Sequence, residues 1–352
     1  MRYYAKGLPW SSGIGTNVEG CQTAQEVMEK AGLNFAVSKC ELVARMPFSI
    51  NGNNEVSDTM GDFSHNGYIF RDCPNAYATY RTDKNIPLGL VKSKYEVVQN
   101  IDAFKFFDDA IGFDKANWQY AGAFGYGHKV FITAKLAMGS TVGGDPIDNY
   151  LVFSNSHDGS SSINILFTPI RVFCTNCLAS AFDSASSYIR IRHTKSAGDR
   201  LERGAKVLRI ACEHAKTANE LYNSLAKINM SDEEVTKYLA DLCLSDEEQA
   251  ALHHYDEKNG YEKLLRSDYL TMESTGISTR KVNIIRSMRD YYFSGVAQDR
   301  ILGTAWGAFN AVTGYYSNVA NLQGEKRMDS LLYGNANVVI RRALHRAYHR
   351  AI

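Results

Sequence analysis

The segment HKVFITAKLAMGSTVGGDPIDNYLVFSNSHDGSSSINILF, residues 128–167, contains three runs of strand-forming residues divided by turn signals. Asp158-Gly159, with His157 before it and Ser160 after it, is a strong short-range signal for a hairpin turn. Asp145-Pro146 marks the turn that precedes the hairpin. We therefore expect antiparallel strands over three ranges, His128–Met138, Tyr150–Ser156 and Ser162–Phe167.

The residues after this hairpin predict a helix and one more strand. Pro169 is expected to end the hairpin, and residues 175–184 are expected to be helical. Tyr188–His193 then alternates, which places Ile189 and Ile191 on one face of a strand. The opposite face carries three side chains, those of Tyr188, Arg190 and Arg192.

The first 120 residues predict a mixture of short elements. Thr23-Ala24-Gln25-Glu26 is a capping box and Gly32 lies where a C-terminal cap belongs, so residues 23–31 predict a helix. We expect two short strands in this region, at Phe35–Val37 and Tyr68–Phe70, and a hairpin with a longer loop between Tyr77–Thr82 and Leu88–Val91. A second helix is expected at Ile101–Ile111.

Beyond Ala197 the pattern is helical. Capping boxes at Ser231–Glu234 and Ser245–Glu248 each begin a helix, and residues 321–324 interrupt the last helical stretch. The sequence therefore predicts an α+β fold, with a central antiparallel sheet, a β-hairpin and packed helices. We expect three regions, a mixed α/β N-terminal region (1–120), a central sheet-plus-helix core (121–228) and a helical C-terminal region (229–352).

The composition is that of an ordinary globular protein. The chain has 352 residues, of which 45% are hydrophobic and 22% are charged, so it can bury a core. No apolar run reaches the roughly 18 residues of a membrane span, and residues 1–6 lack the apolar core of a secretory signal. The seven cysteines are an odd number and widely spread, which is typical of a reducing compartment. We expect a soluble cytoplasmic protein without membrane partners.

Charge is segregated although the net charge is only +1. Residues 190–216 and 326–352 are each +5, whereas residues 229–275 hold twelve acidic and four basic residues, a local −8. In one interpretation, acidic and basic helices pack together or form solvated faces. In a second, the basic residues line a groove that follows a phosphate backbone. In a third, the charged segments bind an acidic protein or join subunits.

The groove interpretation selects seven residues. Arg200, Arg203 and Lys206 are spaced three apart and would line one stripe of a helix. Tyr188 lies beside the two arginines of the preceding strand, where an aromatic ring can stack on a base, although a strand tyrosine is more often a packing residue. The candidate nucleic-acid-binding residues are Tyr188, Arg190, Arg192, Lys195, Arg200, Arg203 and Lys206.

Two candidate metal sites have simpler explanations. Cys174-Thr175-Asn176-Cys177 is a CxxC pattern without a second pair, and only Cys212 and His214 offer further ligands at a distance. We expect buried structural cysteines there. His345 and His349 are spaced i, i+4, but four arginines surround them and no carboxylate lies within that turn. We expect no metal and no cofactor.

No catalytic motif of adequate specificity is present. His157 and Asp158 are adjacent in sequence and so point to opposite faces of a strand, and the hairpin turn accounts for both. The sequence contains no phosphate-binding loop, nucleophile elbow or zinc-protease motif. We assign no catalytic residue. A familiar enzyme class is disfavoured, and an unfamiliar one, with His157, Asp158 and His193 as its polar candidates, stays open.

A series of short stretches resembles the phage/plasmid-like protein family catalogued as domain of unknown function 932. The resemblance covers roughly residues 5–320 and implies a phage, prophage or plasmid setting, and hence a bacterial host cytoplasm, but no activity. It is carried by Pro9-Trp10, Gly13, Gly15-Thr16, Ala31-Gly32-Leu33, Tyr80-Arg81-Thr82-Asp83, Leu88-Gly89, Tyr95–Asn100, Ser156–Ser160, Pro169, Arg171-Val172, Cys174, Asn176, Ile191–Thr194, Gly303–Trp306 and Asn310–Thr313.

The order of strand, hairpin and helix over residues 128–184 is similar to the core of phage single-strand annealing proteins of the Red-beta and RecT type. That resemblance implies binding of single-stranded DNA along a basic groove by a homo-oligomer. We therefore expect a phage or mobile-element protein of DNA metabolism that promotes strand annealing and recombination without covalent catalysis. The alternatives are a structural or host-takeover protein that oligomerises, and an unrecognised nuclease or anti-defence enzyme.

Overall fold

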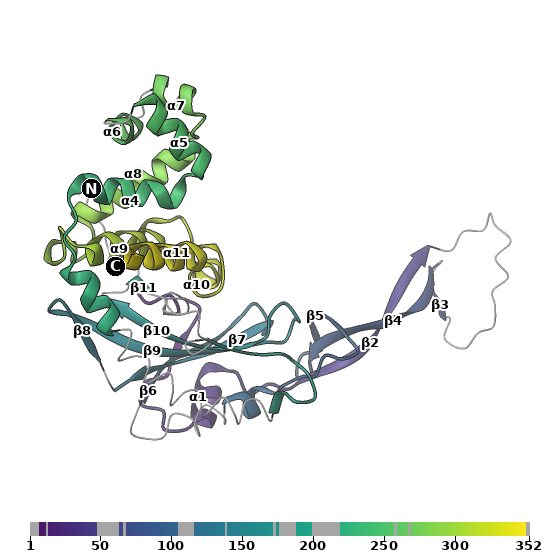
Figure 1. The fold of residues 1–352 in the computed structure, drawn as a ribbon. Helices are drawn as coiled ribbons and strands as arrows, with labels where there is room; N and C mark the ends of the chain where they lie inside the picture. Colours follow the sequence, from purple (N-terminus) through teal and green to yellow (C-terminus); the bar gives the residue numbers. More distant parts are fainter. Residues whose placement is uncertain are drawn as a thin grey trace.

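The structure is a computed structural model that describes most of the chain. The described residues are 7–11, 13–47, 63–65, 68–104, 116–137, 139–171, 174–175, 188–198, 219–256, 259–266 and 269–349. Figure 1 shows a central sheet, a group of helices stacked on one side of it and a long β-ribbon that extends away from both. The predicted α+β class with a helical C-terminal part is confirmed.

The central sheet is antiparallel, with strand order β1-β6-β7-β9-β10-β11, and with β8 on β9 and β12 on β10. This sheet takes strands from both sides of residue 120, the predicted boundary between the first two regions. The division into three regions stays a prediction. The strands are β1 (Thr16–Asn17), β6 (Ala116–Phe124), β7 (Lys129–Leu136), β8 (Ser140–Val142), β9 (Asp145–Ser156), β10 (Ile163–Arg171), β11 (Cys174–Thr175) and β12 (Tyr188–Ile191).

Both faces of this sheet are buried, which explains why β9 and β10 are nearly continuous apolar runs. Ile165 lies opposite Phe153 on β9 and Ile189 on β12, and this face packs against helix α1 (Ala24–Ala31). The other face is covered by a second apolar cluster that includes Trp10 and Met328. Alternate residues of one strand therefore enter two different cores.

Strand β10 continues through Pro169, so the expectation that this proline ends the hairpin is wrong. Pro169 lies opposite Asn149 on β9, and the strand runs on to Arg171. On its other edge β10 pairs with β12 up to Leu166 and with β11 from Ile170. Pro169 falls between these two pairings, at a position where a strand tolerates a residue without an N–H.

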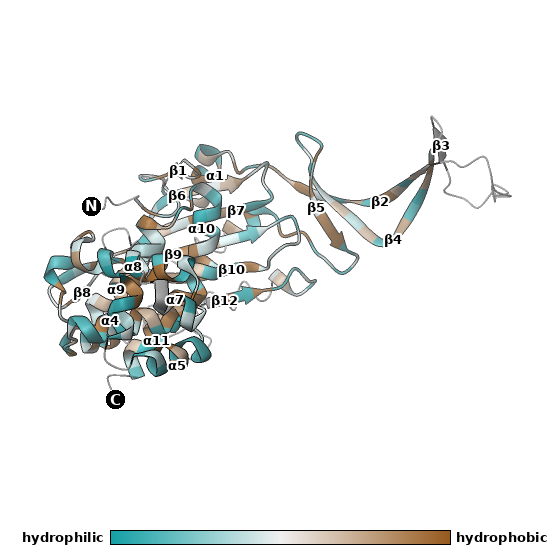
Figure 2. Ribbon diagram, turned by 90° about the horizontal axis from the view of Figure 1, so that it is seen from above, coloured by the Kyte–Doolittle hydropathy of each residue, from teal (hydrophilic) through white to brown (hydrophobic). Residues whose placement is uncertain are grey.

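The extended ribbon, which we call the arm, consists of long strands where two short ones were expected. Residues 37 and 68–70 are the ends of β2 (Val37–Pro47) and β4 (Tyr68–Arg81), which pair antiparallel. Strand β3 (Phe63–His65) adds to β4 near the tip, and β5 (Ile86–Lys92) adds to it at the base. The predicted hairpin of β4 with β5 is confirmed, and Figure 2 shows the arm leaving the body.

The predicted capping boxes begin two helices of the C-terminal part. Ser231 and Glu234 exchange hydrogen bonds at the start of α4, and Ser245 and Glu248 do so at the start of α5. The helices are α4 (Asp232–Cys243), α5 (Asp246–Tyr255), α6 (Gly260–Leu265), α7 (Tyr269–Thr275), α8 (Thr279–Ser294), the 3-10 turn η1 (Gln298–Arg300), α9 (Ala305–Gly314), the π-helical turn η2 (Tyr315–Val319), α10 (Gly324–Leu332) and α11 (Asn335–His349).

Several expectations are tested only in part. The helix expected over 101–111 is described as far as Phe104, where it is helical. Thr175, expected at the start of a helix, lies in β11, and residues 176–187 are outside the described part of the chain. The predicted interruption at 321–324 is confirmed, since α10 begins at Gly324 after the π-helical turn. No helix among the described residues is long and apolar enough to cross a membrane.

Candidate nucleic-acid interface

The β9–β10 turn is clamped against the base of the arm. The backbone N–H groups of His157 and Asp158 both donate to the carbonyl oxygen of His128, and the Thr79 hydroxyl donates to the carbonyl oxygen of His157 at 2.6 Å. Gly89 on β5 lies so close to the Asp158 backbone that a Cβ there would overlap it. The turn is therefore a fixed structural element and not a mobile tip.

Asp158 uses its carboxylate to shape this turn. One carboxylate oxygen accepts hydrogen bonds from the Ser156 hydroxyl at 2.5 Å, and from the Ser160 N–H and hydroxyl at 2.9 and 2.7 Å. Burial opposes the charge, but these bonds outweigh it and hold the pKa of Asp158 below its usual value. Asp158 thus has the turn-forming role that the sequence predicted.

His157 is fully buried and neutral. Asn100 donates to the carbonyl oxygen of Leu33 at 2.9 Å, so its Oδ1 accepts from His157 Nε2, at 2.8 Å. Burial, with His193 nearby, lowers the pKa of His157 to about 4. Because this imidazole has no exposed surface, a catalytic role for His157 has no geometric support.

His193 joins the end of β12 to the segment that follows β5. Its ring stacks on Tyr95 with 4.6 Å between centroids and 22° between planes, and its Nδ1 donates to the carbonyl oxygen of Glu96 at 3.2 Å. The Tyr95 hydroxyl in turn donates to the carbonyl oxygen of Ser156 at 2.7 Å. Burial lowers the pKa of His193 to about 4 and raises the pKa of Tyr95.

These contacts bring two distant cationic pairs to one cavity of 520 Å³, which we call the basic groove. Lys92 is the last residue of β5 and Lys94 follows it, whereas Arg190 lies on β12 and Arg192 directly follows that strand. The hydroxyl-rich turn Ser160–Ser162 lies in the same lining, together with the stacked Tyr95 and His193 rings. Among the described residues that line this groove, none is acidic.

Arg190 also lines a second cavity of 300 Å³ beside the groove. Its Nε donates to the Ser162 hydroxyl at 3.1 Å, which holds the guanidinium at the junction of the two cavities. The second cavity contains Lys129, whose Nζ lies 3.4 Å from the carboxylate of Asp329. The positive lining is therefore strongest in the basic groove and is partly neutralised beyond Arg190.

The structure places only some of the seven predicted residues in this groove. Arg190 and Arg192 line it, and both are exposed, as the predicted alternation with buried Ile191 requires. Tyr188 lies on β12 opposite Leu166. Lys195 is exposed but is not part of the cavity lining. The remaining three, Arg200, Arg203 and Lys206, are outside the described part of the chain.

Sequence reasoning missed Lys92 and Lys94. The local signal was the Lys92-Ser93-Lys94-Tyr95 pattern, two cations beside an aromatic residue at the end of a predicted strand. Their meeting with Arg190 and Arg192 depends on the hairpin turn packing onto β5, a contact between residues about seventy positions apart in sequence. No local pattern contains that information.

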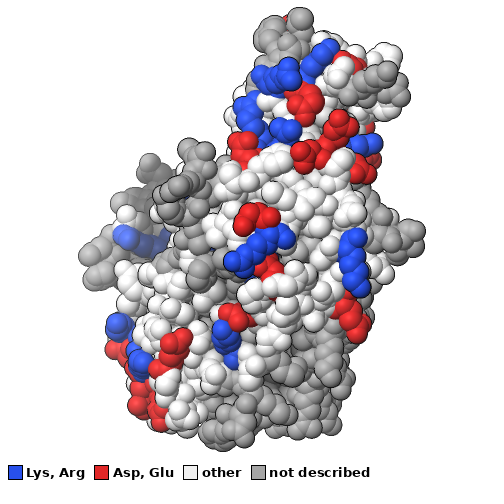
Figure 3. Space-filling view, turned by 90° about the vertical axis from the view of Figure 1, so that its left-hand side faces the viewer, with Lys and Arg blue, Asp and Glu red and all other residues white. Residues whose placement is uncertain are grey.

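The negative charge of residues 229–275 is partly neutralised by basic side chains of neighbouring helices. Lys281 of α8 binds the Glu248 carboxylate at 2.6 Å, and Arg289 of α8 binds Glu262 at 3.2 Å. Arg346 of α11 donates to the carbonyl oxygen of Asp241 at 2.7 Å. Figure 3 shows basic and acidic side chains intermixed over the outer helices. These contacts agree with the interpretation in which acidic and basic helices pack together.

The basic C-terminal stretch is likewise not one continuous surface. Arg327 is buried, and its guanidinium donates to the carbonyl oxygens of Ser317, Leu8 and Gly7 at 3.0, 3.4 and 2.8 Å. Arg327 therefore ties the N-terminal segment to the helices. It is not available to a polyanion.

The two candidate metal sites are the CxxC pattern at residues 174–177 and the His345–His349 pair. Among the described residues, no group of three or more His, Cys, Asp or Glu side chains is arranged to hold a metal ion. Cys174 lies in β11, and Cys177 is outside the described residues. The Nε2 atoms of His345 and His349 are 3.0 Å apart, so one ring donates to the other.

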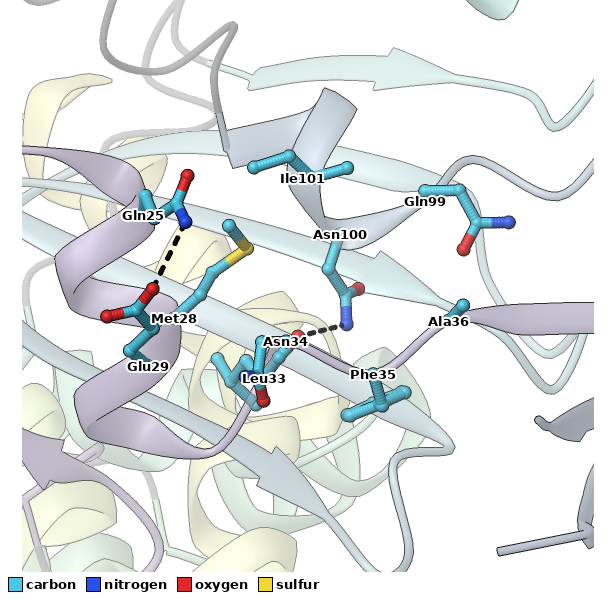
Figure 4. Close-up of a pocket in the computed structure, with 10 residues that line it drawn as sticks. All are labelled: Gln25, Met28, Glu29, Leu33, Asn34, Phe35, Ala36, Gln99, Asn100 and Ile101. Atoms are coloured by element: carbon cyan, nitrogen blue, oxygen red, sulfur yellow. Dashed lines mark hydrogen bonds between the residues drawn. The ribbon is translucent and has the colours of Figure 1, made fainter. Parts of the chain in front are cut away.

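A further cavity of 350 Å³ lies between α1 and residues 99–101 (Figure 4). Its amide groups are engaged: Gln25 donates to Glu29 at 3.1 Å, Asn100 donates to Leu33, and Gln99 bonds the backbone of Val37. Glu29 is the charged residue of its described lining. This cavity therefore suits a phosphate backbone less well than the basic groove.

Comparison with known proteins identifies the family. Residues 87–344 match the family described as Domain of unknown function (DUF932), and the chain belongs to this family. The match begins within β5, after the long strands of the arm, and covers the central sheet from β6 onward and the C-terminal helices from α4 into α11. No curated protein and no solved structure matches the chain. The resemblance to phage annealing proteins therefore gains no support from a known structure.

Proposed function

We propose that this protein is a phage or mobile-element protein of DNA metabolism that binds single-stranded nucleic acid, with DNA favoured, in the basic groove. It does so as a homo-oligomer and promotes strand annealing without covalent catalysis. The observation that supports the proposal is the convergence of Lys92, Lys94, Arg190 and Arg192 on one cavity whose described lining holds no acidic side chain.

Phosphate neutralisation supplies the binding energy in this proposal. Each cation that pairs with a phosphate releases condensed counterions, so the logarithm of affinity falls with the logarithm of salt concentration. For single strands the slope is about −0.7 per phosphate, so four contacts predict a slope of about −3. The bases are left available for pairing with a complementary strand.

The test is a filter-binding titration with single- and double-stranded DNA, and with RNA of the same sequence, at two salt concentrations. In the double variant Arg190→Gln/Arg192→Gln we expect affinity for single strands to fall at least tenfold and the salt slope to become shallower by about 1.4. The matched control Lys237→Gln/Arg341→Gln removes two exposed cations of the helical part and should leave both quantities unchanged.

Annealing is a separate readout of the same proteins. Two complementary labelled oligonucleotides should pair faster with the wild-type protein than without it, and the groove variant should lose this acceleration. If the groove variant binds single strands with unchanged affinity and slope, the basic groove is not the binding site. If binding is lost but annealing is unchanged, annealing does not use this groove.

A further inference from the structure

The outer edge of strand β2 is covered at the base of the arm, and beyond the base no described strand pairs with it. Near the body, Gln99 accepts from the Val37 N–H at 3.0 Å and donates to the Val37 carbonyl oxygen at 2.8 Å. Lys39 Nζ donates to the carbonyl oxygens of Ser93 and Tyr95, both at 3.0 Å. From Cys40 to Met46 the only described strand beside β2 is β4, on its inner edge.

Residues 40–46 of β2 lie in a narrow part of the arm. Strand β5 pairs with β4 only as far as Ala76, so between that point and β3 near the tip the described arm is two strands wide. Val43 and Met46 expose 47% and 45% of their surface there. A two-stranded ribbon is marginally stable in water, and an open strand edge is a template for another strand.

We propose that the open edge of β2 pairs antiparallel with β2 of a second copy of this chain, across a twofold axis at Val43. In this register Val43 lies opposite its own counterpart, and Glu41 lies opposite Arg45 of the second copy. Symmetry repeats the Glu41–Arg45 pair on the other side of the axis. The three positions alternate along the strand, so both ion pairs and the central valine pair lie on one face of the joined sheet.

The neighbouring registers are less favourable. With the axis at Leu42, Lys39 would lie opposite Arg45 of the second copy, a like-charge pair that occurs twice. With the axis at Ala44, Glu41 would lie opposite Pro47, which has no N–H for a ladder bond. The stretch Cys40–Met46, whose outer edge no described strand pairs with, is itself centred on Val43. The charge pattern and the extent of this stretch therefore select the same axis.

The charge of this part of the arm favours a second copy over a polyanion. Residues 40–47 and 68–75 contain two basic and two acidic residues, so they carry no net charge to attract nucleic acid. Strand pairing would also satisfy the backbone groups of the open edge. The proposal deepens the homo-oligomer part of the proposed function and rests on that part. It does not require that the basic groove bind nucleic acid.

Charge-swap variants test the register in the absence of nucleic acid, by sedimentation velocity over a concentration series. The wild type should dimerise. Glu41→Arg and Arg45→Glu each create two like-charge pairs, and each should raise the dimer dissociation constant at least tenfold. The double variant Glu41→Arg/Arg45→Glu restores opposite charges and should return the constant to within about threefold of the wild type.

Rescue by the double variant separates pairing from a local effect. The Arg45 guanidinium lies 3.6 Å from the Tyr68 ring centre within the same arm, and the double variant does not restore that contact. A double variant as weak as the single ones would overturn the register. A wild-type protein that is monomeric throughout the series would overturn the proposal. Filter binding on the same samples shows separately whether nucleic acid binding holds.

Cross-linking tests the axis directly. In a Cys40→Ser/Cys73→Ser background, Val43→Cys should give a covalent dimer on mild oxidation, because residues directly opposite in an antiparallel pair have Cα atoms about 4.5–5.5 Å apart, within reach of a disulfide. Ala44→Cys in the same background lies opposite Leu42 and should stay uncross-linked. Equal cross-linking of the two variants, or none in the first, would contradict pairing at Val43.

Discussion

The Thr79 hydroxyl donates to the backbone carbonyl oxygen of His157 at 2.6 Å, and this bond joins the arm to the turn of the central hairpin. Thr79 is fully buried on β4, and His157 directly follows β9 of the other sheet. The two sheets therefore meet close to the turn residues Gly159–Ser162, which line the basic groove. Variants at this junction report on whether the groove depends on it.

We expect Gly89→Ala to destabilise the protein. A Cβ at Gly89 would overlap the backbone of Asp158, and overpacking of this kind costs about 1–3 kcal/mol. Urea unfolding measures the loss. Gly198→Ala is the matched control, because nothing lies within 4 Å of a Cβ built there and its backbone is not left-handed. Equal stability of the two variants would show that the turn and β5 can separate freely.

We expect stability to fall as the pH is lowered from about 6.5 to about 4. The pKa values of His157 and His193 are about 4 in the folded protein against an ordinary 6.5, so the unfolded chain binds more protons in this window. The free energy of unfolding is therefore highest above pH 6.5 and falls by about 1.4 kcal/mol per pH unit for each histidine. Urea unfolding between pH 4.5 and 7.5 measures this slope.

His157→Gln should remove about one histidine's share of that slope. The glutamine amide reaches the Nε2 position and can still donate to Asn100, so the variant stays folded. His254→Gln, an exposed position, should leave the slope unchanged. An unchanged slope in the His157 variant would mean that this histidine is not held neutral.

We expect Lys92→Gln/Lys94→Gln to weaken single-strand binding as much as the Arg190→Gln/Arg192→Gln variant does. Both pairs line the same cavity, and each should account for about two phosphate contacts. The salt slope from filter binding should therefore become shallower by about 1.4 in either variant. Loss of binding on changing the arginines alone would show that Lys92 and Lys94 do not contact the nucleic acid.

We expect Arg171→Met to be severely destabilising. Arg171 and Asp145 form an ion pair with each side chain only 1% exposed, and Arg171 also donates to the carbonyl oxygen of Ala297 at 2.6 Å. Removing the cation leaves a buried carboxylate, at a cost of about 3–5 kcal/mol. The double variant Arg171→Met/Asp145→Leu should recover most of that loss in urea unfolding. Failure to recover would assign the cost to the Ala297 contact.

The sheet and the helix starts could be predicted because their signals are local. Asp158-Gly159 fixes the hairpin between β9 and β10, and the serine and glutamate of each capping box satisfy each other three residues apart. The prediction that Pro169 ends the strand is wrong because this proline falls between two pairings on the same edge of β10, one with β12 and one with β11. That distinction depends on neighbouring strands, which the local sequence does not show.

The arm and the full groove could not be predicted for two different physical reasons. In the arm, Val43 is an exposed apolar residue between the exposed Glu41 and Arg45, so the alternation of apolar and polar residues that predicts a strand is interrupted there. The groove was predicted through Arg190 and Arg192, but its other wall comes from Lys92 and Lys94 through tertiary packing.

Strand β5 belongs to two parts of the molecule at once. It pairs with β4 from Ile86, opposite Arg81, to Lys92, opposite Ala76, and Lys92 also lines the basic groove. A shift of β4 in the arm would therefore move one of the four cations that line the groove, so the shape of the groove depends on where the arm is held.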